Sequence, residues 1–305
     1  MSQEKIYDLI ILGGGPAGTA AALYGARAGL SLVILEKAVI GGEITATERL
    51  DNFPAFPEGI TGVEFGMLLK EQIDNLAVPL EQTSVEKVNL EDEIKVVYTA
   101  DGKFQGKTVI IATGTEPNLL GVEGEREYLG RGVSYCATCD AAFFRGKEVA
   151  VIGGGNAALE ETIFLARFAS NIYLIHRRDQ FRAVKSLQDK VLALPSVEVL
   201  YSATVDKIIG DKKVTAIEIK QQGKERLIAV DGIFIYAGRK PMLNFLSGDL
   251  LLSGDGFIET NDKMETSIPG VYAAGDIRRK YLRQVITASS DGAVAATAAA
   301  QFIYG

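Results

Sequence analysis

Residues 7–18 read YDLIILGGGPAG, and this stretch decides the fold. Its first six residues are an apolar run typical of a buried strand in a parallel sheet. Gly13, Gly15 and Gly18 then have the spacing of a turn that leads from a strand into a helix. Glycine lets the backbone approach a pyrophosphate, which binds at the helix N-terminus. The stretch therefore predicts the start of a dinucleotide-binding α/β domain.

The flanking sequence supports this interpretation. Residues 19–29, TAAALYGARAG, are rich in helix formers, and residues 31–36, SLVILE, form a second apolar run that ends at Glu36. A carboxylate at this place accepts hydrogen bonds from ribose hydroxyls. The sequence thus predicts a site for FAD or NAD, whereas the alternative is an ordinary strand–helix turn, because the glycine motif alone is weak.

The same pattern occurs a second time. The run KEVAVI (147–152) is followed by GGGNAA (153–158), a helix-forming stretch and the run NIYLIH (171–176). The interval from Gly13 to Glu36 equals the interval from Gly153 to His176, so the two units are in register. We therefore expect a second dinucleotide-binding fold.

The register isolates one difference between the two units. Where the first has Glu36, the second has a cationic cluster made of His176, Arg177, Arg178 and Arg182. A carboxylate repels a 2′-phosphate, whereas arginine and histidine bind one. The first site is predicted to take an adenosine without this phosphate, and the second to take NADP(H). The alternative for HRRDQFR is a solvated surface with salt bridges.

Both units end alike, which predicts the domain organisation. The segments VIIATGTEPN (109–118) and IFIYAGRKPM (233–242) each combine a strand, a glycine turn and a proline, and are the expected linkers. Before them, Asp101-Gly102 and Gln222-Gly223 are expected hairpin turns. We predict an FAD-binding domain from residues 1–115 and 243–305, with an NADPH-binding domain, 116–242, inserted into it.

The last segment carries no phosphate motif. DGFIET (255–260) and SIPGVYAAGDI (267–277) are expected to contain strands, and residues 283–303 an alanine-rich helix that packs on the first domain. Asp276 follows the second of these strands. It is suited to binding a polar ligand chain, but it could equally be a helix N-cap.

Cys136 and Cys139, in SYCATCDAAF (134–143), are the only cysteines, and the chain has one histidine. A tetrahedral zinc site or an iron–sulfur cluster within the chain needs more ligands, so no metal is expected. A disulfide across two residues closes too small a loop to stabilise the fold much. A reversible redox dithiol is the favoured function, and the alternative is a pair of buried thiols, which the polar Thr138 and Asp140 disfavour.

The composition excludes several classes of protein. The formal net charge is −7, which disfavours nucleic acid as a partner. No apolar run reaches the length of a membrane span, and the first residues lack the pattern of a signal peptide. We therefore expect a cytoplasmic protein without a membrane partner.

With these motifs in place, the chain from about residue 6 to residue 303 resembles the low-molecular-weight thioredoxin reductases. The motifs that carry the resemblance are GGGPAG, GGEIT, IIATG, CATCD, VIGGGNAALEE, HRRDQFRA, SIPGVYAAGD and RQVITA. The implied fold is α/β, with two Rossmann-like, three-layer ββα dinucleotide-binding domains, the second inserted into the first.

The resemblance implies a homodimeric, FAD-containing enzyme that reduces thioredoxin with NADPH. Hydride passes from NADPH to FAD, the electrons pass to a Cys136–Cys139 disulfide, and the dithiol exchanges with oxidised thioredoxin. Cys139 would face the flavin, Cys136 would attack thioredoxin, and Asp140 would protonate the leaving thiolate. A rotation of the inserted domain at the two linkers is also implied.

The resemblance also assigns the cofactor sites. FAD is assigned to Gly13, Gly15, Gly18, Glu36, Lys37, Gly42, Glu43, Asn52, Gly114, Asp276, Arg283 and Gln284. NADPH is assigned to Gly155, Asn156, Ala157, His176, Arg177, Arg178 and Arg182. The sequence departs from the family at Glu43, where many members have glutamine, and in GRKPMLNF (238–245).

Other functions remain open at this stage. A related enzyme class feeds the same dithiol from ferredoxin, and a second class reduces a peroxidase through an additional cysteine pair. A third class lacks the dithiol and passes electrons from NADPH to ferredoxin. A non-enzymatic redox sensor is the alternative outside enzymes. The glycine and arginine motifs, the cysteine count and CATCD favour thioredoxin reduction over these.

Overall fold

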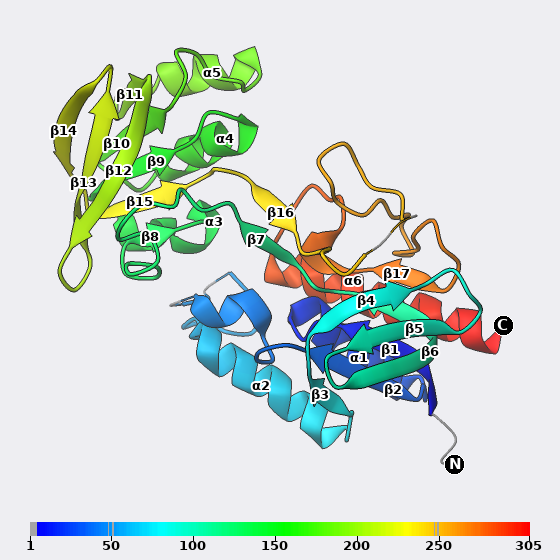
Figure 1. Cartoon of the computed structure of the whole chain (residues 1–305). Helices are drawn as coiled ribbons and strands as arrows, with labels where there is room; N and C mark the ends of the chain where they lie inside the picture. Colours follow the sequence, from blue (N-terminus) through cyan, green and yellow to red (C-terminus); the bar gives the residue numbers. More distant parts are fainter. Residues whose placement is uncertain (1–4, 48, 51, 247, 249) are drawn as a thin grey trace. The chain divides into compact units, whose positions relative to one another are not determined.

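The computed structural model describes residues 5–47, 49–50, 52–246, 248 and 250–305, and the chain divides into two compact units (Figure 1). The host unit comprises residues 1–116 and 240–305, and the inserted unit comprises residues 117–239. Within the described residues, no helix has both the length and the apolar character needed to cross a membrane. The assignment of FAD and NADPH to separate domains stays a prediction.

The host unit is built on one sheet, with the strand order β3-β2-β1-β6-β5-β4. Its central strands are parallel and are joined through helices, whereas β4, β5 and β6 form an antiparallel meander. Apolar residues fill β1 and β2 because both faces of these strands are buried. The bounds are β1 Ile6–Leu12, β2 Leu32–Glu36, β3 Leu80–Gln82, β4 Val85–Asn89, β5 Lys95–Thr99, β6 Gly102–Ile111 and β17 Val271–Ala273.

Strand β6 pairs with three other strands of this sheet. On one edge its first half pairs with β5, antiparallel, and its second half pairs with β17, parallel. Its other edge pairs with β1. The last segment of the chain is thereby fixed into the sheet that the first segment began.

Helices α1 and α6 pack closely in the host unit because small residues line their contact. A Cβ added at Gly292 would lie 2.0 Å from the carbonyl oxygen of Ala17, so the two backbones approach as only glycine permits. Alanines of α6 share a buried core with α1 and the sheet, which confirms the expected packing of this helix. The bounds are α1 Pro16–Arg27, α2 Gly62–Asn75, α6 Val285–Tyr304, and the short helices η1 Gly42–Ala46 and η3 Gly275–Ile277.

The inserted unit repeats the nucleotide-binding pattern with a different meander. Its parallel sheet has the order β11-β10-β9-β15-β8, and β12, β13 and β14 form a separate antiparallel sheet. The strands are β8 Val133–Ser134, β9 Glu148–Ile152, β10 Asn171–His176, β11 Val197–Tyr201, β12 Ala203–Gly210, β13 Val214–Gln221, β14 Lys224–Ala229 and β15 Gly232–Ile235. The helices are α3 Ala137–Asp140, η2 Ala141–Phe144, α4 Asn156–Leu165 and α5 Lys185–Leu192.

The two linkers contain short strands. Strands β7, Thr115–Pro117, and β16, Arg239–Pro241, form a two-stranded sheet where the chain passes between the units. Each of these strands ends at a proline, which lacks the N–H group needed to continue a ladder.

Two local expectations differ from the structure. Residues 255–260 form no continuous strand, because Ile258 makes only isolated bridges, to Leu252 and to Arg278. The first hairpin turn is shifted by one residue: Thr99 pairs with Gly102, so Ala100 and Asp101 form the turn. The second turn is as predicted, since Gln222 and Gly223 both have positive φ and join β13 to β14.

Candidate active site

The glycine turn of the host unit joins β1 to α1 and leaves space at the N-terminus of α1. Gly13 has a φ of 105°, and a Cβ on Gly18 would lie 1.8 Å from the carbonyl oxygen of Gly13, so both positions require glycine. Gly15 is the N-cap of α1, without a side-chain cap in the described structure, and the nearest atom to an added Cβ there is 3.9 Å away. The N-terminus of α1 therefore has unsatisfied N–H groups and room for an anion.

Glu36 supports this turn from the end of β2. Its carboxylate accepts a hydrogen bond from the N–H of Gly14 at 2.6 Å and another from the N–H of Ala38 at 2.8 Å. A carboxylate has about four acceptor positions, so these bonds leave capacity for ribose hydroxyls. The neighbouring Lys37 is exposed.

The other predicted residues of the host unit lie where its parallel strands end. Gly42 and Glu43 begin η1, and a Cβ on Gly42 would lie 3.4 Å from the Cα of Gly15. Gly114 follows β6, has a φ of 69° and has open space at its Cβ position. Because β1, β2, β6 and β17 run parallel, their carboxyl ends meet along one edge of the sheet. Ligands bind at this edge in open α/β sheets.

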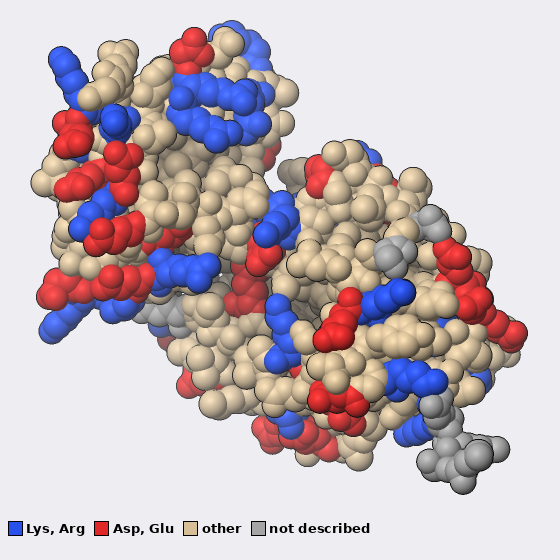
Figure 2. All heavy atoms as spheres, in the orientation of Figure 1, with Lys and Arg blue, Asp and Glu red and all other residues tan. Residues whose placement is uncertain are grey.

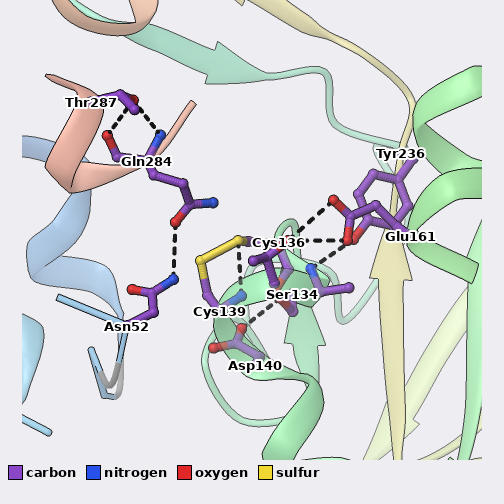
Figure 3. Close-up of a disulfide and its surroundings, with 11 residues drawn as sticks. Asn52, Ser134, Cys136, Cys139, Asp140, Glu161, Tyr236, Gln284 and Thr287 are labelled. Atoms are coloured by element: carbon purple, nitrogen blue, oxygen red, sulfur yellow. Dashed lines mark hydrogen bonds between the residues drawn. A yellow bond between two sulfur atoms is a disulfide. The ribbon is translucent and has the colours of Figure 1, made fainter. Parts of the chain in front are cut away.

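The segment after β17 brings three more predicted residues to the host unit's site. Asp276 is half-buried in η3, and the Arg283 guanidinium lies 4.1 Å from the centre of the Phe257 ring. Gln284 is the N-cap of α6, and its side-chain oxygen accepts a hydrogen bond from Asn52 at 3.0 Å (Figure 3). Asp276 is not the N-cap of a long helix, because α6 begins only after Gln284.

Sequence reasoning missed a buried ionic cluster that fixes this segment. Asp291 of α6 accepts a hydrogen bond from the N–H of Gly275 at 3.0 Å and forms ion pairs with Lys280, at 2.7 Å, and Arg278, at 3.4 Å. The side chains of Asp291 and Lys280 are only 9% and 6% exposed. The available signal was one charged residue in an otherwise uncharged, alanine-rich helix.

The glycine turn of the inserted unit repeats that of the host. Gly153 has a φ of 154°, Gly155 is the N-cap of α4 without a side-chain cap in the described structure, and no atom lies within 4 Å of an added Cβ at Gly155. Asn156 and Ala157, the first residues of α4, are exposed, and the side-chain oxygen of Asn156 accepts the N–H of Val184 at 3.0 Å.

The cationic cluster differs from its expected form at one residue. His176 is 4% exposed, and no group of the described chain bonds its Nε2. Burial first, and then Arg182, Arg178 and Arg177, lower the pKa of His176, so its ring is neutral at pH 7. A Cβ on Gly154 would lie 2.3 Å from the ring, so His176 packs against the glycine turn instead of presenting a positive charge.

The three arginines of the cluster are exposed, and none pairs with a carboxylate of the described residues. The predicted alternative, a surface of salt bridges, is therefore not what the structure contains. Figure 2 shows Lys and Arg side chains gathered over the region of α4 and α5.

Cys136 and Cys139 form a disulfide, with their Cα atoms 5.3 Å apart (Figure 3). Cys136 is the N-cap of α3, and its sulfur accepts the N–H of Cys139 at 3.2 Å. Ser134 donates from its hydroxyl to Asp140 at 2.6 Å and accepts the N–H of Cys136 at 3.0 Å. The turn thus holds an acid in a fixed place four residues after the first cysteine, and the assignment of roles to these residues stays a prediction.

Known proteins resemble this chain over nearly its whole length. A sequence profile of the pyridine nucleotide-disulphide oxidoreductases matches residues 7–292. Thioredoxin reductase of Bacillus subtilis is 42% identical over 307 residues, covering 99% of this chain and 96% of the relative. Thioredoxin reductase of Peptoclostridium acidaminophilum is 40% identical, covering 98% of both chains.

The crystal structure of thioredoxin reductase from Streptococcus pyogenes superposes with a TM-score of 0.93, at 41% identity and 98% coverage of both chains. Flavin and pyridine nucleotide use are the common property of the family. The chain therefore belongs to the pyridine nucleotide-disulphide oxidoreductases and, within them, to the thioredoxin reductases.

Proposed function

We propose that this oxidoreductase reduces thioredoxin with electrons from NADPH, through FAD and the Cys136–Cys139 disulfide. The observation that carries the proposal is that disulfide, located in a unit that also contains a glycine turn and a cluster of exposed arginines. Bound FAD would supply two-electron transfer between the nicotinamide and the disulfide. We further propose that the enzyme is a homodimer, as the resemblance implies.

The host unit has the features that FAD binding requires. The glycine turn and the N-terminus of α1 suit the pyrophosphate, and Glu36 suits the ribose of an adenosine without a 2′-phosphate. The rest of the cofactor would bind where the parallel strands end and the next helices begin. The predicted residues located there are Gly42, Glu43, Gly114, Asp276, Arg283 and Gln284.

Two glycines of this turn should respond differently to alanine. Gly18→Ala forces a Cβ against backbone and is expected to lower the midpoint of thermal unfolding by about 5 °C or more. Gly15→Ala is conformationally neutral, because Gly15 has a φ of −71°, but its methyl group occupies the predicted phosphate position. It should weaken FAD binding by about tenfold or more.

Apo-protein melting curves and flavin titration measure these two effects. Equal flavin affinity of Gly15→Ala and the wild type would contradict the placement of the pyrophosphate at α1.

The inserted unit has the features that NADPH binding requires. The N-terminus of α4 suits the pyrophosphate, and Arg177, Arg178 and Arg182 suit the 2′-phosphate because their guanidinium groups have no acidic partner among the described residues. His176 would support the turn at Gly154 and contribute no charge at neutral pH.

The dithiol supplies the chemistry toward thioredoxin. After reduction, the Cys136 thiolate attacks one sulfur of the thioredoxin disulfide and releases the other as a thiolate, which takes a proton from Asp140. Cys139 then attacks the Cys136 sulfur of the mixed disulfide, releases dithiol thioredoxin and restores the disulfide of the enzyme. The N–H of Cys139 donates to the Cys136 sulfur and would stabilise its thiolate.

A coupled assay tests the proposal. Purified holoenzyme, thioredoxin and a disulfide dye are mixed with NADPH, NADH or reduced ferredoxin, and thiol release is followed. We expect rapid release with NADPH alone. No release with NADPH would refute the function, and equal release with reduced ferredoxin would favour the ferredoxin-fed class.

A further inference from the structure

Hydrogen bonds from backbone N–H groups and side chains fix the dithiol turn. The N–H of Cys136 bonds Ser134, the N–H of Cys139 bonds the Cys136 sulfur, and the N–H of Asp140 bonds the Cys136 carbonyl. Ala137 and Thr138 lie between the two cysteines. The Ala137 N–H and the Thr138 hydroxyl each contact a side chain from another element.

Tyr236 holds the first of these donors. The N–H of Ala137 donates to the Tyr236 hydroxyl oxygen at 2.7 Å, across 99 residues of sequence (Figure 3). Tyr236 directly follows β15, and its own N–H bonds the carbonyl of Ile152 at 2.8 Å. Burial, followed by the charge of Glu161, raises the pKa of Tyr236, so the phenol stays neutral.

Glu161 of α4 contacts the side chain of Thr138. The Thr138 hydroxyl lies 3.4 and 3.5 Å from the two oxygens of the Glu161 carboxylate. Burial is the largest cause of a raised pKa at Glu161, and these bonds only partly oppose it. The carboxylate is therefore placed against the residue that precedes Cys139.

Tyr236 and Glu161 also belong to the elements that form the predicted NADPH site. A Cβ on Gly153 would lie 3.0 Å from the Tyr236 carbonyl oxygen and 3.2 Å from its Cβ, so Tyr236 packs on the glycine turn. Glu161 lies on α4, the helix that begins at this turn. Tyr236 and the helix of Glu161 therefore contact both the glycine turn and the dithiol turn.

We propose that Tyr236 and Glu161 are positioning residues of the dithiol, which hold the Ala137 N–H group and the Thr138 hydroxyl and leave the Cys139 N–H directed at the Cys136 sulfur. This inference rests on the proposed function for its effect on turnover. The orientation of the turn determines how well the Cys136 thiolate is stabilised, and the charge of Glu161 opposes that thiolate.

The experiment measures how fast iodoacetamide alkylates Cys136 in the fully reduced holoenzyme as a function of pH, with peptide mapping to identify the residue. Titratable groups around the turn are Asp140 on α3, Glu161 on α4, Tyr236 after β15, and the Tyr135–Glu125 pair before α3. Because both changes leave Asp140 and Tyr135 in place, shifts of the midpoint report on the substituted group.

Tyr236→Phe keeps the ring but leaves the Ala137 N–H without its acceptor. The turn then reorients, and the alkylation midpoint is expected to rise by about one pH unit, which corresponds to a tenfold weaker stabilisation of the thiolate. Glu161→Gln keeps an acceptor but removes the charge, so its midpoint should fall. Shifts in opposite directions separate positioning and charge effects from general loosening of the structure.

Tyr173→Phe is the matched control, because it removes a phenol hydroxyl of the same unit that bonds Glu148 at 3.2 Å instead of the dithiol turn. It should leave the midpoint unmoved. Tyr236→Phe should also lower thioredoxin turnover by about tenfold.

An unmoved midpoint in Tyr236→Phe would overturn the inference. If Tyr236→Phe does not fold, the alkylation midpoint of Glu161→Gln is the test. A midpoint equal to that of the wild type would also overturn the inference. The alkylation assay needs no thioredoxin, so a wild-type enzyme that failed to reduce thioredoxin would refute the proposed function while leaving the positioning of the dithiol separately tested.

Discussion

Replacing Cys139 by serine is expected to reduce NADPH-dependent turnover of thioredoxin by about three orders of magnitude or more, because no disulfide can form on the enzyme. The flavin should remain bound, since Cys139 lies in the inserted unit and the residues predicted to hold FAD lie in the host unit. Thiol release in the coupled assay measures turnover, and the visible absorbance of the purified variant measures flavin content.

Cys136→Ser is the partner variant and should also be inactive toward thioredoxin, because the attacking thiol is lost. Both variants should still reduce ferricyanide with NADPH, which separates loss of the dithiol from loss of either cofactor. Thioredoxin turnover at the wild-type rate in either variant would show that electrons leave the enzyme by another route.

Replacing Arg177 and Arg178 together by alanine is expected to raise the KM for NADPH by about a hundredfold. A charge-assisted hydrogen bond contributes about 1.5 kcal/mol, and two such bonds to the 2′-phosphate would be lost. The KM for NADH should change little, because NADH has no phosphate at this position. Steady-state kinetics with both nucleotides gives the two ratios.

Arg226→Ala is a suitable control, since Arg226 is an arginine of the same unit that already pairs with Glu198 at 3.3 Å. It should leave both KM values close to those of the wild type. An equal rise for NADPH and NADH in the double variant would contradict recognition of the 2′-phosphate by the arginines.

The features predicted well from the sequence are those whose cause is local. The glycine turns at Gly13 and Gly153 follow from backbone space within a few residues, and both adopt positive φ as the motif requires. The hairpin turn at Gln222-Gly223 likewise depends only on neighbouring residues. The alanine content of residues 285–304 indicated a closely packed helix, which α6 is.

The features that the sequence did not reveal depend on partners distant in the chain. The Asp291 cluster needs α6 to meet the segment after β17, and the Ala137–Tyr236 bond needs β15 to lie beside the dithiol turn. The neutral His176 follows from burial, which the cationic motif alone does not reveal. Residues 255–260 were predicted to form a short strand, but Ile258 has only single bridging partners.

The pairing of β17 with β6 has a consequence for biosynthesis. The inserted unit is one continuous stretch of chain, so it can fold on the ribosome as soon as residue 239 has emerged. The host sheet cannot be completed before β17 and α6 have been translated, because they join strands made much earlier. Nascent chains arrested before residue 271 should therefore expose the unpaired backbone edge of β6 at residues 109–111 and depend on chaperones, while the part that carries the dithiol is already protected from proteases.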